Sequence, residues 1–108
     1  MIYEWRMYEI ALGKKAALYE RFSKHTIKLF EKYGIKVVGF WESKIGGTTN
    51  TLYYMLAFRD LTHLDEAWKS FRSDPEWQKV LEESDRDGPL VVKIRNIVLT
   101  PTQYSPMQ

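Results

Sequence analysis

In the segment from Tyr3 to Ile10, residues Tyr3 to Tyr8 alternate between two kinds of side chain, and this constrains the fold more than any other feature of the chain. One set is apolar: Tyr3, Trp5 and Met7. The other set is charged or carries a hydroxyl group: Glu4, Arg6 and Tyr8. Because alternate residues of a strand point to opposite sheet faces, the pattern predicts a strand with one apolar and one polar-aromatic face. Such a polar face either meets water or lines a pocket, and this choice decides what the protein does.

Length and composition exclude several classes of protein. The 108 residues predict a single domain, residues 1–108, of which residues 100–108 are an extended tail. The absence of cysteine excludes disulfides, thiolate metal sites and a cysteine nucleophile. The net charge of +2 is too small to indicate nucleic acid as a partner. No apolar run is long enough for a membrane span, and no leader pattern precedes the first strand, so we expect a cytoplasmic protein.

Two helical regions are predicted from apolar residues at three- and four-residue spacing. The first stripe contains Leu18, Phe22, Thr26, Leu29, Phe30 and Tyr33. Gly34 follows it and is expected to be a left-handed C-cap. The second stripe contains Leu61, Leu64, Trp68 and Phe71, and Thr62 three residues before Asp65 predicts a capping box at its start. Asp74 as N-cap and Pro75 at the first helical position predict a new helical start.

Three further strands complete the expected elements. Ile35–Glu42 and Leu52–Phe58 flank a glycine-rich turn and predict a hairpin, in which Gly39 indicates a bulge or a close approach of backbone or ligand. Val91–Leu99 is the last strand, and it carries the charges of Lys93 and Arg95 on one face only.

This order of elements predicts an α+β, ferredoxin-like βαββαβ fold, an antiparallel sheet with helices on one face. Right-handed crossovers place the first and third strands at the centre, with the fourth beside the first and the second beside the third. The other sheet face is then uncovered in a single chain, and it carries large residues. A twofold partner is the simplest cover, so we expect a homodimer, a dimeric α+β barrel. In a monomer, the polar sheet face would meet water.

Four segments in this order resemble the NIPSNAP family. They are Tyr3–Tyr8 with Gly13-Lys14, Glu31–Trp41, Asp74–Trp77, and Leu99–Pro106. The resemblance covers nearly the whole chain and implies a ferredoxin-like protomer and a dimer whose two sheets face each other. It implies no established reaction. Related dimeric barrels include cofactor-free monooxygenases and haem-degrading enzymes, which is an analogy of fold alone.

The polar face of the first strand is the leading candidate for a site. If the last strand pairs antiparallel with the first, Lys93 or Arg95 can lie near Glu4. One interpretation is a buried cluster that binds an anionic or carbonyl-bearing ligand, with Glu4 as base and Arg6 as anchor. The alternative is an ion-paired network that only stabilises the dimer's barrel.

Aromatic residues and one histidine extend this candidate site. Trp41, Tyr53, Tyr54 and Tyr8 either shape an aromatic pocket or pack in the core or dimer interface. His25 is either a haem ligand or proton shuttle, or a partly exposed surface residue. The two histidines lack metal-ligand spacing, so neither a metal nor a cofactor is expected. The candidate ligand-binding residues are therefore Glu4, Arg6, Tyr8, His25, Trp41, Tyr54 and Arg95.

Three functions remain open at this stage. The first is binding of a small organic ligand between the sheet and the helices. The second is a cofactor-independent monooxygenase-like reaction that uses Tyr8 and His25 to move protons. The third is a non-catalytic protein-interaction module that uses the exposed helices or the tail at residues 100–108.

Overall fold

The computed structural model describes residues 1–108, and its elements follow the predicted order. They are β1 (Ile2–Ile10), α1 (Lys15–Arg21), η1 (Phe22–Thr26), α2 (Ile27–Lys32), β2 (Lys36–Glu42), β3 (Thr51–Phe58), α3 (Leu61–Ser73), α4 (Pro75–Ser84) and β4 (Val91–Leu99). The strands form one antiparallel sheet in the order β2-β3-β1-β4. This is the predicted α+β, ferredoxin-like arrangement, with β1 and β3 at the centre.

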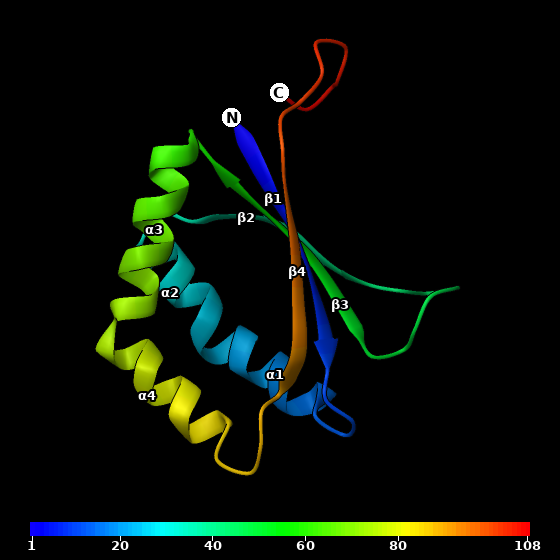
Figure 1. The fold of residues 1–108 in the computed structure, drawn as a ribbon, viewed down its shortest axis with the longest axis vertical. Coiled ribbons are helices and arrows are strands. Elements are labelled where there is room, and N and C mark those ends of the chain that lie inside the picture. The colour runs from blue at the N-terminus through cyan, green and yellow to red at the C-terminus, as the bar shows by residue number, and fades with distance from the viewer.

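All helices lie on one face of the sheet, and the other face is uncovered in the single chain (Figure 1). The register of β1 with β3 pairs Glu4 with Leu56, Arg6 with Tyr54 and Tyr8 with Leu52. Since directly paired residues share a face, the polar set of β1 lies on the same face as the fully buried apolar residues of β3.

The polar face of β1 therefore lies beneath the helices and does not meet water in a single chain, contrary to the sequence-based expectation for a monomer. Glu4 is only 2% exposed and Tyr8 only 8%. The uncovered face is instead the apolar one, which carries Trp5 and Met7. The reason is packing. The alternate residues of β3, Leu52, Tyr54, Leu56 and Phe58, are buried in the core with the helices, and the register of β1 with β3 places the polar set of β1 on that same face.

The first helical region is not one regular helix. It runs as α1, then the π-helical turn η1, then α2. The predicted apolar stripe is buried at Leu18, Phe22, Thr26 and Leu29, and Thr26 donates its hydroxyl hydrogen to the carbonyl of Arg21 at 3.3 Å. Gly34 ends the region with φ of 70°, as the sequence predicted, because a residue with a side chain is strained at that angle.

The second helical region begins two residues earlier than expected. Its N-cap is Asp60, whose carboxylate accepts from the backbone N–H of His63 at 2.8 Å, so the prediction of a capping box at Thr62 is wrong. Asp74 separates α3 from α4 and caps α4, with Pro75 at the first helical position, as predicted. Both caps satisfy N–H groups that a helix start leaves without partners.

Two irregularities and the tail complete the description. The β2–β3 register shifts between Val37 and Gly39, which is the bulge predicted at Gly39. Residues 100–108 follow β4 without a helix or strand, and the Tyr3 hydroxyl donates to the backbone carbonyl of Gln108 at 2.6 Å. None of the helices has the length and apolar character needed to cross a membrane. The cytoplasmic location stays a prediction.

Candidate functional site

Glu4 is the acceptor at the centre of a buried polar cluster. Its carboxylate accepts from the indole N–H of Trp68 at 2.6 Å, from the side-chain amide of Asn96 at 2.9 Å and from Arg6 at 2.9 Å. These three donors come from α3, β4 and β1, so the carboxylate joins three elements. A buried charge is tolerated when it is paired and fully hydrogen-bonded, and this arrangement meets both conditions.

All three side-chain nitrogens of Arg6 donate hydrogen bonds within the same cluster. Its Nε donates to the Tyr54 hydroxyl at 2.7 Å, one terminal nitrogen donates to Glu4, and the other donates to the Tyr8 hydroxyl at 3.2 Å. The guanidinium also lies 4.5 Å from the centre of the Trp68 ring, in cation–π geometry. Burial alone would lower the pKa of Arg6, but the oxygens of Tyr54, Tyr8 and Glu4 outweigh it and raise that pKa, so the side chain stays charged.

Tyr54 and Tyr8 complete the cluster. Tyr54 donates its hydroxyl hydrogen to the Tyr8 oxygen at 2.7 Å, and the two rings meet edge to face, 5.2 Å apart. Burial is the main reason that the pKa of the Tyr54 hydroxyl is raised well above its usual value, and the neighbouring Tyr8 adds to it. Tyr54 is therefore a neutral hydrogen-bond donor across the physiological pH range.

Arg6 and Tyr8 of this polar cluster form the floor of a cleft between the sheet and the helices, which we call the sheet–helix cleft, and Glu4 and Tyr54 lie behind them. The volume of the cleft is about 370 Å³. Its polar lining consists of Arg6, Tyr8, Arg21, Thr26, Arg72 and Asp85. Its apolar lining consists of Phe22, Phe30, Trp68, Phe71, Trp77, Leu81, Val91 and Ile94. A mostly apolar concavity of this size with a few convergent polar groups is typical of a small-molecule site.

Arg21, the last residue of α1, lies on the helical wall of the cleft and also borders the separate depression that His25 lines. Its side chain is 7% exposed, and one terminal nitrogen donates to the Ser84 hydroxyl at 3.0 Å and to the Asp85 carboxylate at 3.1 Å. Its Nε has no hydrogen-bond partner and is the one buried side-chain polar atom of the chain in that condition. Buried donors without a partner are uncommon in native proteins, so this atom calls for an explanation.

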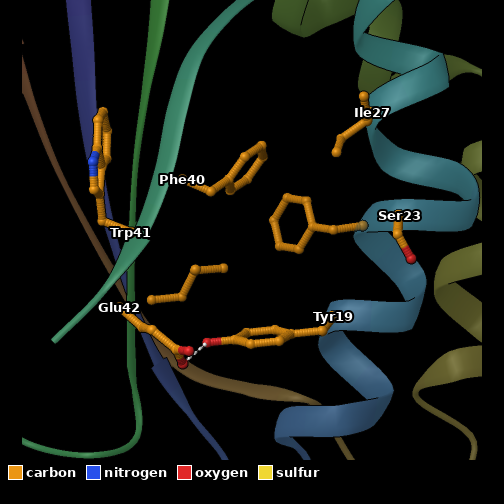
Figure 2. Close-up of a pocket in the computed structure, with 8 residues that line it drawn as sticks. Tyr19, Ser23, Ile27, Phe40, Trp41 and Glu42 are labelled. Carbon is orange, nitrogen blue, oxygen red and sulfur yellow. Dashed lines mark hydrogen bonds between the residues drawn. The ribbon is translucent and has the colours of Figure 1, made fainter. Parts of the chain in front are cut away.

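A smaller depression of about 260 Å³ lies between α1–η1 and β2. Figure 2 shows Phe40 pointing from β2 toward the helix, Trp41 pointing away from it, and the Tyr19 hydroxyl bonded to Glu42. The only carboxylate here, Glu42, accepts from Lys15 and Tyr19, and its pKa is lowered mainly by the bond from Lys15. Burial and the bond to Glu42 raise the pKa of Tyr19 to about 12. Because it holds no buried charge, this depression is a weaker candidate site than the sheet–helix cleft.

Four of the residues predicted for the site lie together, and three do not. Glu4, Arg6, Tyr8 and Tyr54 form the cluster beneath the helices. Trp41 is 47% exposed and contacts Trp5 on the uncovered sheet face. His25 is exposed and borders a separate shallow depression on the outer side of the helices.

Arg95 is the third residue that the structure places elsewhere. It pairs with Met7 and shares the uncovered face of the sheet, and Lys93 pairs with Glu9 on that same face. The expected approach of Lys93 or Arg95 to Glu4 is therefore wrong, and Asn96 takes that place. The difference is one residue of register, which moves every side chain of a strand to the opposite face.

Trp68, Asn96 and Arg21 were missed by reasoning from the sequence. Trp68 looked like an ordinary member of an apolar helical stripe, although its indole N–H needs a partner when it is buried. Asn96 is the one uncharged polar residue inside the last strand, which was a usable signal. Arg21 carried no signal, since an arginine at the edge of a helix is normally solvated. No group of three or more histidine, aspartate or glutamate residues lies close enough together to hold a metal ion.

Comparison with known proteins relates the chain to one family. The NIPSNAP family model matches residues 3–106. Protein NipSnap homolog 3B from Homo sapiens is 31% identical over 77 residues, which is 71% of this chain and 30% of that protein. The chain thus spans about a third of the length of the curated relatives it matches.

Solved structures agree with this relationship. The protein Atu4242 from Agrobacterium tumefaciens superposes with a TM-score of 0.86 and 26% identity over 100% of both chains. A protein from Nitrosomonas europaea, whose assignment as an antibiotic biosynthesis monooxygenase is itself inferred, superposes with a TM-score of 0.64 over 94% of this chain and 98% of its own. Its identity is only 8%, so it shares the fold and nothing further follows from it.

Proposed function

This chain belongs to the NIPSNAP family, and on that premise we propose that it binds a small organic ligand in the sheet–helix cleft. The observation that carries the proposal is the pair Arg6 and Tyr8, which line a cleft of about 370 Å³ and are held from behind by bonds to Glu4 and Tyr54. A core needing only stability gains little from a buried ion pair, because well-packed apolar residues do as well or better. Polar groups fixed at the floor of an apolar cleft instead orient a ligand.

A monooxygenase-like reaction is the weaker candidate. It required Tyr8 and His25 to move protons together, but Tyr8 lies at the floor of the cleft and His25 borders a different, shallow depression. Tyr54, the nearest neighbour of Tyr8, has a raised pKa and so is a poor base near neutral pH. Interaction with other proteins through residues 100–108 stays a prediction.

We also propose that the protein is a homodimer that pairs through its uncovered sheet face. Ile97 and Leu99 of β4 are 51% and 41% exposed on this face, beside Trp5, Met7, Tyr53 and Met55 of the central strands. Monomeric proteins rarely expose a continuous apolar patch of this kind. A second copy of the chain offers a matching patch, as in a twofold interface.

Native mass spectrometry of the purified protein tests the ligand proposal. Under gentle conditions we expect each chain to carry a small adduct, taken up during expression or from an added compound panel, and to lose it on activation. Ile94 is 52% exposed and lines the cleft, so Ile94→Trp should fill part of the cleft and abolish the adduct. Leu61→Trp, at a 64% exposed position outside the cleft, is the matched control and should keep it. The proposal is wrong if no compound binds, or if Ile94→Trp and Leu61→Trp bind alike.

A further inference from the structure

The cleft holds two buried guanidinium groups, and they differ in what they have left to offer a ligand. Arg6 donates to Tyr54, to Glu4 and to Tyr8, and its flat face is covered by Trp68. Each of its three nitrogens already donates one bond, so only the second hydrogens of its two terminal nitrogens are left for a ligand. Arg6 therefore mainly holds together the residues beneath the cleft.

Arg21 has fewer hydrogen-bond partners than Arg6. Only one of its three nitrogens donates a bond, to Ser84 and Asp85, and its Nε is buried without any partner. The guanidinium lies over the Trp77 ring at 5.5 Å, so it is held in place by packing as well as by the ion pair. A fixed guanidinium with free donors in a mostly apolar site is well suited to bind a carboxylate.

The charge balance of the cleft favours the same kind of ligand. Three arginines line it, Arg6, Arg21 and Arg72, against one lining carboxylate, Asp85. Glu4 compensates Arg6 from below, and Asp85 accepts from Arg21, but Arg72 forms no ion pair. The cleft therefore carries an excess of positive charge within apolar walls.

We propose that the sheet–helix cleft takes a small organic carboxylate with an apolar body, and that Arg21 is the residue that binds the carboxylate. The apolar body packs between Phe22, Phe71 and Trp77, and the second terminal nitrogen of Arg21, which donates no bond within the chain, meets a carboxylate oxygen. This inference rests on the proposed function, because it names the class of ligand for the same cleft.

Matched acids and amides test the charge requirement directly. The probes are phenylacetate and cyclohexanecarboxylate, with phenylacetamide and cyclohexanecarboxamide as neutral partners of the same shape, each titrated at neutral pH up to its solubility limit. The readout is the indole N–H signals in nitrogen-15 NMR spectra. Trp68 and Trp77 line the cleft, whereas Trp5 and Trp41 contact each other on the uncovered face and report any binding elsewhere.

We expect the acids to shift the Trp68 and Trp77 signals at concentrations at least about tenfold lower than the amides, because bonds to a charged group are worth about 1.5–3 kcal/mol. Arg21→Gln should remove this preference, and Arg21→Lys should keep part of it. Arg59→Gln removes an exposed arginine outside the cleft and controls for net charge; it should leave the preference unchanged.

Asp85→Asn separates a binding role of Arg21 from a purely structural one. If Arg21 only joins the end of α1 to the end of α4, Asp85→Asn and Arg21→Gln destabilise the fold alike and neither changes the preference for acids. If Arg21 binds the carboxylate, Asp85→Asn removes a competing acceptor, so the acids should bind as tightly as to the wild type or more tightly.

The outcomes distinguish carboxylate binding by Arg21 from ligand binding in the cleft. Amides that bind as well as acids, or an acid preference that survives Arg21→Gln, would overturn the assignment of a carboxylate to Arg21 and leave the ligand cleft standing. If neither acids nor amides shift Trp68 and Trp77, while Ile94→Trp has no effect on adducts in native mass spectra, both proposals fail together.

Discussion

Arg6 is a charged residue that the fold buries without leaving any of its nitrogens unbonded. Every polar side chain of the Glu4–Arg6–Tyr8–Tyr54 cluster has a partner, and the only buried side-chain polar atom of the chain without one is Nε of Arg21. Such a cluster is stable only as a unit, because removing one member leaves another buried group without its partner.

Tyr54→Phe tests this coupling. The substitution removes one hydroxyl group and leaves the ring, so both Nε of Arg6 and the Tyr8 oxygen lose a bond of 2.7 Å. We expect the free energy of unfolding to fall by about 1–3 kcal/mol, the usual range for a buried donor or acceptor left unsatisfied. Unfolding by urea, followed by circular dichroism, measures this change.

Tyr53→Phe is the matched control, one residue earlier on the opposite face of β3. The Tyr53 hydroxyl forms no hydrogen bond within the chain and its ring stacks on Trp5, so we expect a change of less than about 0.5 kcal/mol. Equal losses for the two variants would mean that the cluster is not coupled.

The membership of this cluster could be predicted only in part. Glu4, Arg6 and Tyr8 share a face because of strand alternation, which the sequence displays directly. Trp68 and Asn96 join Glu4 across 64 and 92 positions of the chain, and their positions depend on the packing of α3 and on the register of β4. No local pattern encodes either distance.

At the level of elements, the π-helical turn η1 decides which residues the first helical region presents to the cleft. Arg21, Phe22 and Thr26 all line it: Arg21 and Phe22 meet where α1 gives way to η1, and Thr26 is the last residue of η1. A π-helical turn has i→i+5 hydrogen bonds and inserts extra backbone, so it re-aims the residues next to it. Regular helical spacing predicted burial of Phe22 and Thr26 but not the turn itself.

The junction between α3 and α4 is predicted to respond to acid. The Asp74 carboxylate accepts from the Tyr33 hydroxyl, from Lys32 at 2.9 Å and from the N–H groups of Glu76 and Trp77. The bonds from Tyr33 and Lys32 lower the pKa of Asp74 below its usual value of 3.8. Because the unfolded chain takes up this proton first, the stability contributed by Asp74 is complete above pH 3.8 and is lost as the pH falls through the lowered value.

Asp74→Asn keeps a helix-capping side chain but cannot be ionised. We expect the wild type to be more stable than Asp74→Asn at neutral pH, and the gap to shrink steadily as the pH falls below 3.8. Thermal unfolding across a pH series measures it. Asp65→Asn on the exposed side of α3, 3.9 Å from Lys69, should show no such pH-dependent gap. A difference in stability that stays constant across the pH series would contradict the lowered pKa of Asp74.

At the level of the whole molecule, the two faces of the sheet differ in what covers them. The helices cover one face of the sheet (Figure 1), and this face carries the polar cluster. The other face carries the apolar patch around Trp5 and Ile97. In the proposed homodimer, the second face is buried against a copy of itself and the two clefts stay separate.

Ile97→Asp tests the homodimer. Because burying an unpaired carboxylate costs several kcal/mol, this substitution should weaken dimerisation at least about a hundredfold. Size-exclusion chromatography with light scattering should give a dimer for the wild type and a monomer for Ile97→Asp. Leu61→Asp introduces the same charge at the start of α3 and should stay dimeric. A monomeric wild type would make the homodimer prediction wrong, and a dimeric Ile97→Asp would place the interface elsewhere.

The sequence by itself determined the order of the elements, the sheet topology and the start of α4 at Asp74, because alternation, helical spacing and capping are properties of neighbouring residues. Only the tertiary structure decided which face of the sheet the helices cover, and hence that Glu4 and Arg6 lie beneath them. It also decided that Asn96, not Arg95, meets Glu4, since one residue of register reverses a strand. These outcomes depend on competition between whole faces for burial, a sum over residues far apart in the chain that no single segment contains.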